Sequence, residues 1–159
     1  MSSTGDELRD LMRAFPSGVA VLTVDAEGGR LGLTVGSLVS LSLAPPLVGV
    51  AVNRNAAMHE LLRGAGRFAF SLLAGDQTAI AQHFARGVPP IAMWHGVSWR
   101  TGASGAPLLD GALGWIECTL AAEHVTGDHT LFVGEVVALE RSRAGPALLY
   151  VDRRYVAQT

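Results

Sequence analysis

Two long apolar segments face each other across a short turn, and they constrain the fold more than any other feature of the chain. ALGWIECTLAAEHV covers residues 112–125, HTLFVGEVVALERS covers residues 129–142, and Thr126-Gly127-Asp128 lies between them. Gly and Asp are typical turn residues, and the flanking segments are rich in β-branched and apolar residues. The pattern predicts a long antiparallel hairpin, so the sheet that contains it must also be largely antiparallel.

Shorter segments of the same kind extend this sheet. We predict strands at VAVLTV (19–24), LVGVAVN (47–53), RFAFSLL (67–73) and PALLYVDRRYV (146–156), with a hairpin turn at residues 25–30. Capping residues and apolar spacing predict an N-terminal helix within residues 1–14. Two further helices are expected, one at 56–64 capped by Asn55 and ended by Gly64, the other at 77–87 capped by Asp76 and ended by Gly87. Residues 88–110 read as a long loop.

These elements predict a mainly β fold with six or seven antiparallel strands and short inserted helices. A closed or partly closed barrel removes the exposed edges of such a sheet. We expect one domain over residues 1–159, since the chain has no repeat or linker and 49% of its residues are hydrophobic.

Composition excludes several classes of function. The net charge of -2 and the absence of a basic block argue against nucleic acid as a partner. No apolar run reaches the roughly 18 residues of a membrane span, and the polar N-terminus is unlike a signal peptide. The single cysteine, Cys118, fits the reducing cytoplasm. All twelve basic residues are arginine, which excludes Schiff-base chemistry through lysine.

The segment GLTVGSLVSLSLAPPL (32–47) carries unusually many small and polar residues for a strand. A regular strand would point Thr34 and Ser37 to opposite faces, whereas a bend at Gly36 would bring them together. Small side chains let a flat ligand approach the backbone, and hydroxyls or free N–H groups then bind its polar atoms. The alternative is a bent strand with solvated serines.

The next predicted strand ends in Asn53-Arg54-Asn55, just before a predicted helix. An arginine fork beside the N–H groups of a helix start suits a phosphate. The alternative is an exposed arginine beside a capping asparagine.

Other catalytic patterns are absent. There is no G-x-G-x-x-G turn and no G-x-S-x-G elbow. The five histidines are scattered; His124 and His129 match no zinc spacing, and we expect no metal.

These signals together resemble one family, the flavin reductase-like, FMN-binding split-barrel proteins, and within it the short-chain flavin reductases of two-component monooxygenases. The similar pieces are FPSGVAVLTV, residues 32–55, RFAFSLLAGDQTAIAQHFA, residues 105–139 and PALLYVDRRY, in the family's order. The resemblance covers nearly the whole chain, from about Met12 to Tyr155.

The resemblance implies a split β-barrel that binds FMN or FAD and takes hydride from NADH or NADPH. It places the flavin against Leu33, Thr34, Val35, Gly36, Ser37, Ser40, Asn53, Arg54, Asn55, Phe84 and Tyr155. It associates His129, in the GDHT segment, with the nicotinamide side of the site. Because cofactor and substrate carry the chemistry, we expect His129 to position the nicotinamide or balance charge rather than act as an essential base.

The sequence departs from the family pattern at Gly36, where an asparagine is usual, and this loss bears on flavin affinity. The resemblance also implies a homodimer and a separate monooxygenase that receives reduced flavin. One alternative is a flavin carrier or sensor without reductase activity. Others are an oxidase similar to the pyridoxamine-phosphate oxidases and a haem- or metal-binding barrel.

Overall fold

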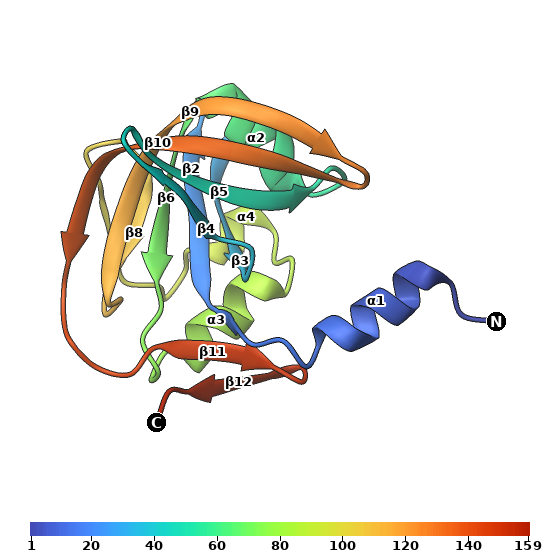
Figure 1. Ribbon diagram of the computed structural model, residues 1–159. Coiled ribbons are helices and arrows are strands. Elements are labelled where there is room, and N and C mark those ends of the chain that lie inside the picture. Colours follow the sequence, from blue (N-terminus) through green and yellow to red (C-terminus); the bar gives the residue numbers. More distant parts are fainter.

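The computed structural model describes all residues 1–159 and has a mainly antiparallel β architecture with short helices (Figure 1). A seven-stranded sheet has the order β3-β2-β6-β9-β10-β5-β4 and curls around the core. Its strands are β2 (Ala20–Ala26), β3 (Gly29–Val35), β4 (Val39–Leu43), β5 (Pro46–Asn53), β6 (Arg67–Leu72), β9 (Gly114–Thr126) and β10 (His129–Arg141). The predicted fold class is thereby confirmed.

The predicted long hairpin is β9–β10, and it joins the two halves of the sheet. β10 pairs with β9 on one side and with β5 on the other, while β9 pairs with β6. The register shifts at Val133/Gly134 and at Val136/Ala138. Gly134 permits a close approach there, since a Cβ at this position would lie 2.6 Å from Phe68 Cζ and 2.8 Å from Cys118 Cβ. These bulges bend the hairpin so that it wraps over the core.

The core lies inside the curled sheet. Its largest fully buried side chains include Phe68, Phe70, Phe84 and Phe132, packed with aliphatic residues of β2. Burial of each such ring contributes roughly 1.5–3 kcal/mol relative to exposure. Phe68 and Phe70 contact edge to face, with ring centroids 5.7 Å apart.

Two helices begin one residue later than the sequence predicted. α2 (Ala57–Ala65) has Ala56, not Asn55, at its N-cap, and it ends at the left-handed Gly66 rather than at Gly64. α3 (Thr78–Ala85) has Gln77 at its N-cap, while Asp76 pairs instead with Arg143. Neither helix has a side-chain cap hydrogen bond, so both predicted caps are wrong. The backbone amide of Asn55 instead donates to Asn53 Oδ1, which holds the turn before α2.

Residues 88–110 contain more structure than the predicted loop. They form α4 (Pro90–Met93) and the strand pair β7 (Trp99–Thr101) and β8 (Pro107–Leu109). The predicted last strand is also two strands, β11 (Leu148–Val151) and β12 (Arg154–Ala157). They pair with each other because Asp152 and Arg153 both adopt positive φ and reverse the chain. β11 also pairs with β1 (Ser17–Gly18).

α1 (Thr4–Met12) lies apart from the sheet and has no buried residue (Figure 1). A complete capping box between Ser3 and Asp6 defines its start. The helix therefore begins near the predicted position but ends before residue 14. No helix of the protein is long and apolar enough to cross a membrane.

The single thiol offers a test of the core. Cys118 is fully buried opposite Phe68, and burial raises the pKa of its thiol to about 12. Since the thiolate is the reactive form, we expect no reaction with Ellman's reagent at pH 8 in the native protein. One thiol per chain should appear after denaturation in guanidinium chloride. Rapid labelling of the native protein would contradict this packing.

Candidate functional site

The segment after β3 bends at Gly36, as predicted, and hydrogen bonds fix it on both sides. Thr34 Oγ1 donates to the carbonyl of Ala81 in α3 at 2.7 Å. Ser37 Oγ donates to the carbonyl of Ala51 in β5 at 3.0 Å and accepts from its amide at 3.1 Å. The two hydroxyls thus tie the bend to α3 and to β5. The bend does not bring the two hydroxyls onto a common partner.

Two adjoining cavities lie at this bend, and we call them together the bend cavities. One has a volume of about 140 Å³ and includes Thr34, Val35, Gly36 and Tyr155 in its lining. The other, of about 520 Å³, is lined by Gly36, Ser37 and part of α1. Ser17, Gly36 and Tyr150 line both. Five of the predicted flavin contacts therefore line the bend cavities.

The missing side chain at Gly36 has a structural counterpart in Ser17. A Cβ at Gly36 would lie 2.6 Å from Ser17 Oγ. The Ser17 hydroxyl thus occupies the space that a side chain at Gly36 would enter. The sequence did not indicate a role for Ser17, because a serine next to Pro16 is typical of the end of a helix.

Tyr150 is the second residue that the sequence did not single out. The β11–β12 turn places it directly across from Tyr155, with ring centroids 4.9 Å apart. Burial raises the pKa of the Tyr155 phenol, so this group remains a protonated donor at neutral pH. The turn that pairs the two tyrosines depends on positive φ at Asp152 and Arg153, which non-glycine residues rarely adopt, so the sequence carries no signal for it.

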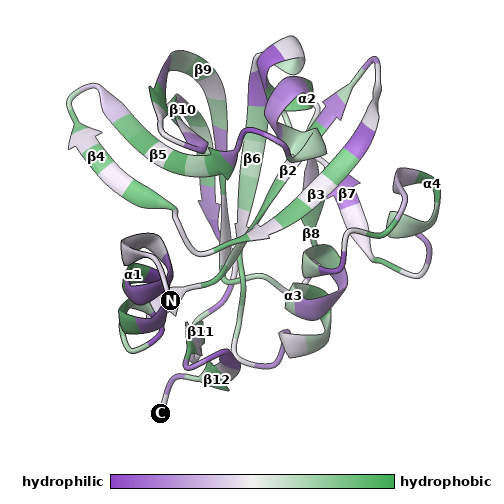
Figure 2. Ribbon diagram, turned by 90° about the vertical axis from the view of Figure 1, so that its right-hand side faces the viewer, coloured by the Kyte–Doolittle hydropathy of each residue, from purple (hydrophilic) through white to green (hydrophobic).

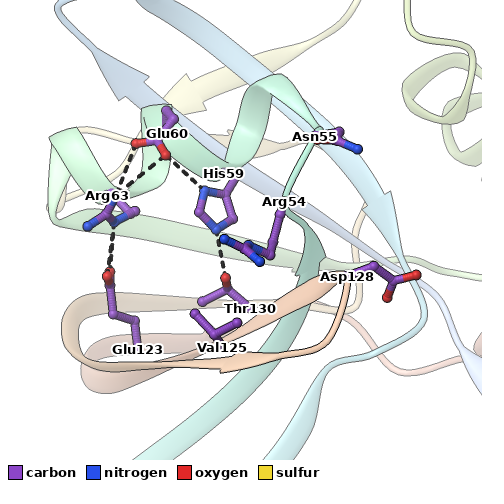
Figure 3. A pocket seen from close by; sticks show the side chains of 9 residues that line it. All are labelled: Arg54, Asn55, His59, Glu60, Arg63, Glu123, Val125, Asp128 and Thr130. Atoms are coloured by element: carbon purple, nitrogen blue, oxygen red, sulfur yellow. Dashed lines mark hydrogen bonds and ion pairs between the residues drawn. The ribbon is translucent and has the colours of Figure 1, made fainter.

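Arg54 and Asn55 line a larger cavity, of about 690 Å³, between α2 and the tip of the β9–β10 hairpin (Figure 3). We call it the hairpin cavity. The buried His59 forms its inner wall, with Nε2 2.7 Å from Thr130 Oγ1 and Nδ1 3.2 Å from Glu60 Oε1. Arg63 bridges Glu60 and Glu123 at 3.2 and 3.0 Å.

Arg54 differs from its neighbour Arg63 because it forms no ion pair within the chain. The ion pairs of this region join Arg63 to Glu60 and Glu123, and Asp128 to His129. Figure 3 shows the Arg54 side chain reaching from the end of β5 into the space between α2 and the hairpin. An exposed guanidinium without a carboxylate partner is available to bind an anion.

His129 begins β10 and lies directly across from Asn53 at the end of β5. Its Nδ1 is 2.6 Å from Asp128 Oδ1. This hydrogen bond, with the charge of the ring, lowers the pKa of the Asp128 carboxyl. The ionised Asp128 carboxylate accepts a hydrogen bond from the Nδ1–H group of His129, which leaves Nε2 available for a ligand. The predicted residues Asn53, Arg54 and His129 are thereby brought together.

Three predicted contacts lie elsewhere. Leu33 and Phe84 line an apolar cavity of about 210 Å³ on the other side of β3. Phe84 is buried against Gly32, where a Cβ would lie 2.6 Å from its ring. Ser40 is exposed in β4, across from Val48, and lines none of these cavities. No group of three His, Cys, Asp or Glu side chains is close enough to hold a metal.

β5 connects the two regions of the site. Ser37 is bound to Ala51, and the strand then runs through Asn53 to Arg54 at the hairpin cavity. A strand rises about 3.3 Å per residue, so roughly 10 Å of backbone separates Ala51 from Arg54. The arrangement suits an elongated ligand with a flat polar ring at one end and an anionic group at the other.

Comparisons with known proteins show the family to which the chain belongs. The family described as "Flavin reductase like domain" matches residues 12–159. An NADH-dependent FAD reductase of Streptomyces globisporus is 40% identical over 152 residues, which are 94% of this chain and 83% of that protein.

Solved structures of flavin reductases are also similar to this chain. The flavin reductase component BorF of a bacterial two-component tryptophan halogenase superposes with a TM-score of 0.90 at 38% identity, covering 97% of this chain and 98% of that one. The S. globisporus C-1027 NADH:FAD oxidoreductase SgcE6, in complex with NAD and FAD fragments, also superposes with a TM-score of 0.90. Its identity is 37%, and the match covers 96% of this chain and 91% of that one.

Proposed function

The chain belongs to the family of flavin reductase-like domains, and we propose that it transfers hydride from NADH to a flavin, FAD or FMN, and releases the reduced flavin to a partner monooxygenase. The proposal rests mainly on the hydrogen bonds between the Ser37 hydroxyl and the backbone of Ala51. They connect the small-residue bend with Asn53, Arg54 and His129. Similarity to reductase components, among them that of a 4-hydroxyphenylacetate 3-monooxygenase in Salmonella typhimurium, supports the partner.

The residues of the site bind and orient rather than react. Residues 34–37 line the bend cavities and offer a wall for a planar ring, and Tyr155 offers a phenolic donor. Arg54 and Asn55 provide charge and hydrogen bonds for the phosphate end. The flavin, when bound, supplies the acceptor for hydride, a step that depends on close alignment of donor and acceptor.

The first experiment is the oxidation of NADH and NADPH at 340 nm with FMN or FAD added in turn. We expect flavin-dependent oxidation of NADH, because the site combines a flavin wall with a nucleotide-binding edge. The four combinations rank both cofactors. No oxidation together with clear flavin binding would favour the alternative, a flavin carrier or sensor.

We expect His129→Ala to lower kcat without preventing flavin binding. Its ring lies at the start of β10, away from the bend cavities, so flavin affinity should change little. Turnover should fall about ten- to a hundredfold if the imidazole aligns the nicotinamide. Flavin fluorescence quenching measures binding separately from turnover. An equal loss of binding and turnover would contradict this role.

We also infer that the protein is a homodimer that works in the cytoplasm, where NADH is available. α1 has only nine residues, and helices shorter than about 12–15 residues are marginal in water without packing. Leu8, Leu11, Met12 and Phe15 are all exposed on or beside it, as the mixed hydropathy of α1 in Figure 2 illustrates. The edge strand β4 adds Val39, Leu41 and Leu43. A second copy of the chain would cover both surfaces, and α1 lines one of the bend cavities.

Leu11→Asp should weaken the dimer because Leu11 is 72% exposed in the single chain and would become buried in the interface. Size-exclusion chromatography with light scattering should show a monomer at micromolar concentration. The matched control is Ile91→Asp on α4, which changes another exposed apolar residue to the same charge. A wild-type monomer, or a variant as dimeric as the control, would contradict the inference.

A further inference from the structure

We propose that Arg9 of α1 places a positive charge beside the bend cavities and thereby stabilises the reduced form of the bound flavin relative to the oxidised form. The inference rests on the proposed function and adds a residue to it, since the match to the family begins only at residue 12. The oxidised flavin ring is neutral near neutral pH, whereas the reduced ring carries a negative charge. A charge close to the ring nitrogens therefore acts differently on the two forms.

The lining of the bend cavities is cationic. It includes Arg9 and Arg13 but no Asp or Glu. The hairpin cavity, in contrast, combines arginines with the carboxylates of Glu60, Glu123 and Asp128. Both bend cavities share the wall at residue 36, so a ring that lies against this wall faces α1 across the larger cavity. An excess of positive charge there suits an anionic ring better than a neutral one.

Two faces of α1 serve different contacts. Arg9 and Arg13, four residues apart, share the face that lines the larger bend cavity. Leu8 and Leu11 are exposed and line neither bend cavity, so they remain available for the dimer interface inferred above. At the end of the helix, the carbonyl of Arg13 accepts a hydrogen bond from the amide of Asp152 at 2.8 Å. This bond ties α1 to the β11–β12 turn.

Arg9 is the less neutralised of the two arginines. Arg13 Nη1 is 2.6 Å from Asp10 Oδ1, whereas Arg9 Nη1 is 3.8 Å from Asp6 Oδ1. The Arg9 side chain is 75% exposed, so water screens its charge and its effect on a ligand is modest.

The charge of Arg9 also reaches the tip of the β9–β10 hairpin. The pKa of Asp128 is lowered mainly by the hydrogen bond to His129 and by the charge of that ring, and to a smaller extent by Arg9. Arg9 therefore acts on the space between the bend cavities and the start of β10. This is the space where we place the flavin ring and the nicotinamide.

The test varies the charge at residue 9. Arg9→Lys, Arg9→Gln and Arg9→Glu form a charge series, and all three new residues are good helix formers. Arg67→Gln and Arg67→Glu are the matched controls, because Arg67 is an exposed arginine of β6 that lines neither the hairpin cavity nor the bend cavities.

The probes are FMN and FAD, each either oxidised or reduced with dithionite in the absence of oxygen. Anaerobic calorimetry at low ionic strength measures the Kd of each form, with no NADH and no turnover. The phosphate chain is the same in both forms, so its contribution cancels in the ratio of the two Kd values.

We expect Arg9→Gln to raise the Kd of the reduced flavin about two- to fivefold and to leave the Kd of the oxidised flavin unchanged. Arg9→Glu should raise the Kd of the reduced form further, because it reverses the charge, while Arg9→Lys should behave like the wild type. The Arg67 variants should keep the wild-type ratio. Added salt should reduce the difference between Arg9→Gln and the wild type.

Two results would overturn the proposal. One is a Kd of the reduced flavin that does not depend on the charge at residue 9. The other is an equal change for the oxidised and reduced forms, which would mean that Arg9 affects the structure or the shared phosphate chain. Failure of the proposed function differs from both, because the wild-type protein would then bind both forms of the flavin but oxidise no NADH.

Discussion

The pair of hydrogen bonds between Ser37 and Ala51 is the interaction on which the arrangement of the site depends. One hydroxyl satisfies both the amide and the carbonyl of a residue in β5, at the point where β4 has stopped pairing with that strand. A buried backbone group without a partner is costly, so this hydroxyl stabilises the bend against straightening. The bend then sets the position of Gly36 and of both cavities around it.

The β9–β10 hairpin supplies the other half of the site from a distant part of the sequence. Its bulges curve the two long strands over the core, and its tip meets the end of β5. The amide of Arg54 donates to the carbonyl of Asp128 at 2.9 Å, which joins the tip to the loop before α2. His129, proposed to position the nicotinamide, and Arg54, proposed to bind an anion, thus lie at the same edge of the sheet. His129 lies on a strand, where residues are held more precisely than on free loops, and the hydrogen bond to Asp128 holds the backbone of Arg54.

Much of the fold followed from the sequence because strand patterns and turn residues are local signals. The strands β2, β5, β6, β9 and β10 were predicted in this way. Helix caps were less predictable, although Asn55 and Asp76 are good capping residues. Asp76 pairs with Arg143 instead of capping α3, and the turn before Ala56 moves the start of α2. Ser17 and Tyr150 were missed since their place at the cavities depends on pairing between β1 and β11, about 130 residues apart in the chain. Ser40 remains a prediction that the geometry of the cavities does not support.

The ionisable groups around the site suit a reaction that needs alignment more than proton transfer. Hydrogen bonding to His129 lowers the pKa of Asp128, so its carboxyl stays charged at neutral pH. Burial raises the pKa of Tyr155, so its phenol stays neutral there. Both groups therefore keep one protonation state at neutral pH. General acid–base catalysis instead needs a group whose pKa is close to the working pH. Asp128 and Tyr155 can therefore help to orient bound molecules without themselves titrating at neutral pH, and hydride transfer between NADH and a flavin depends on such orientation.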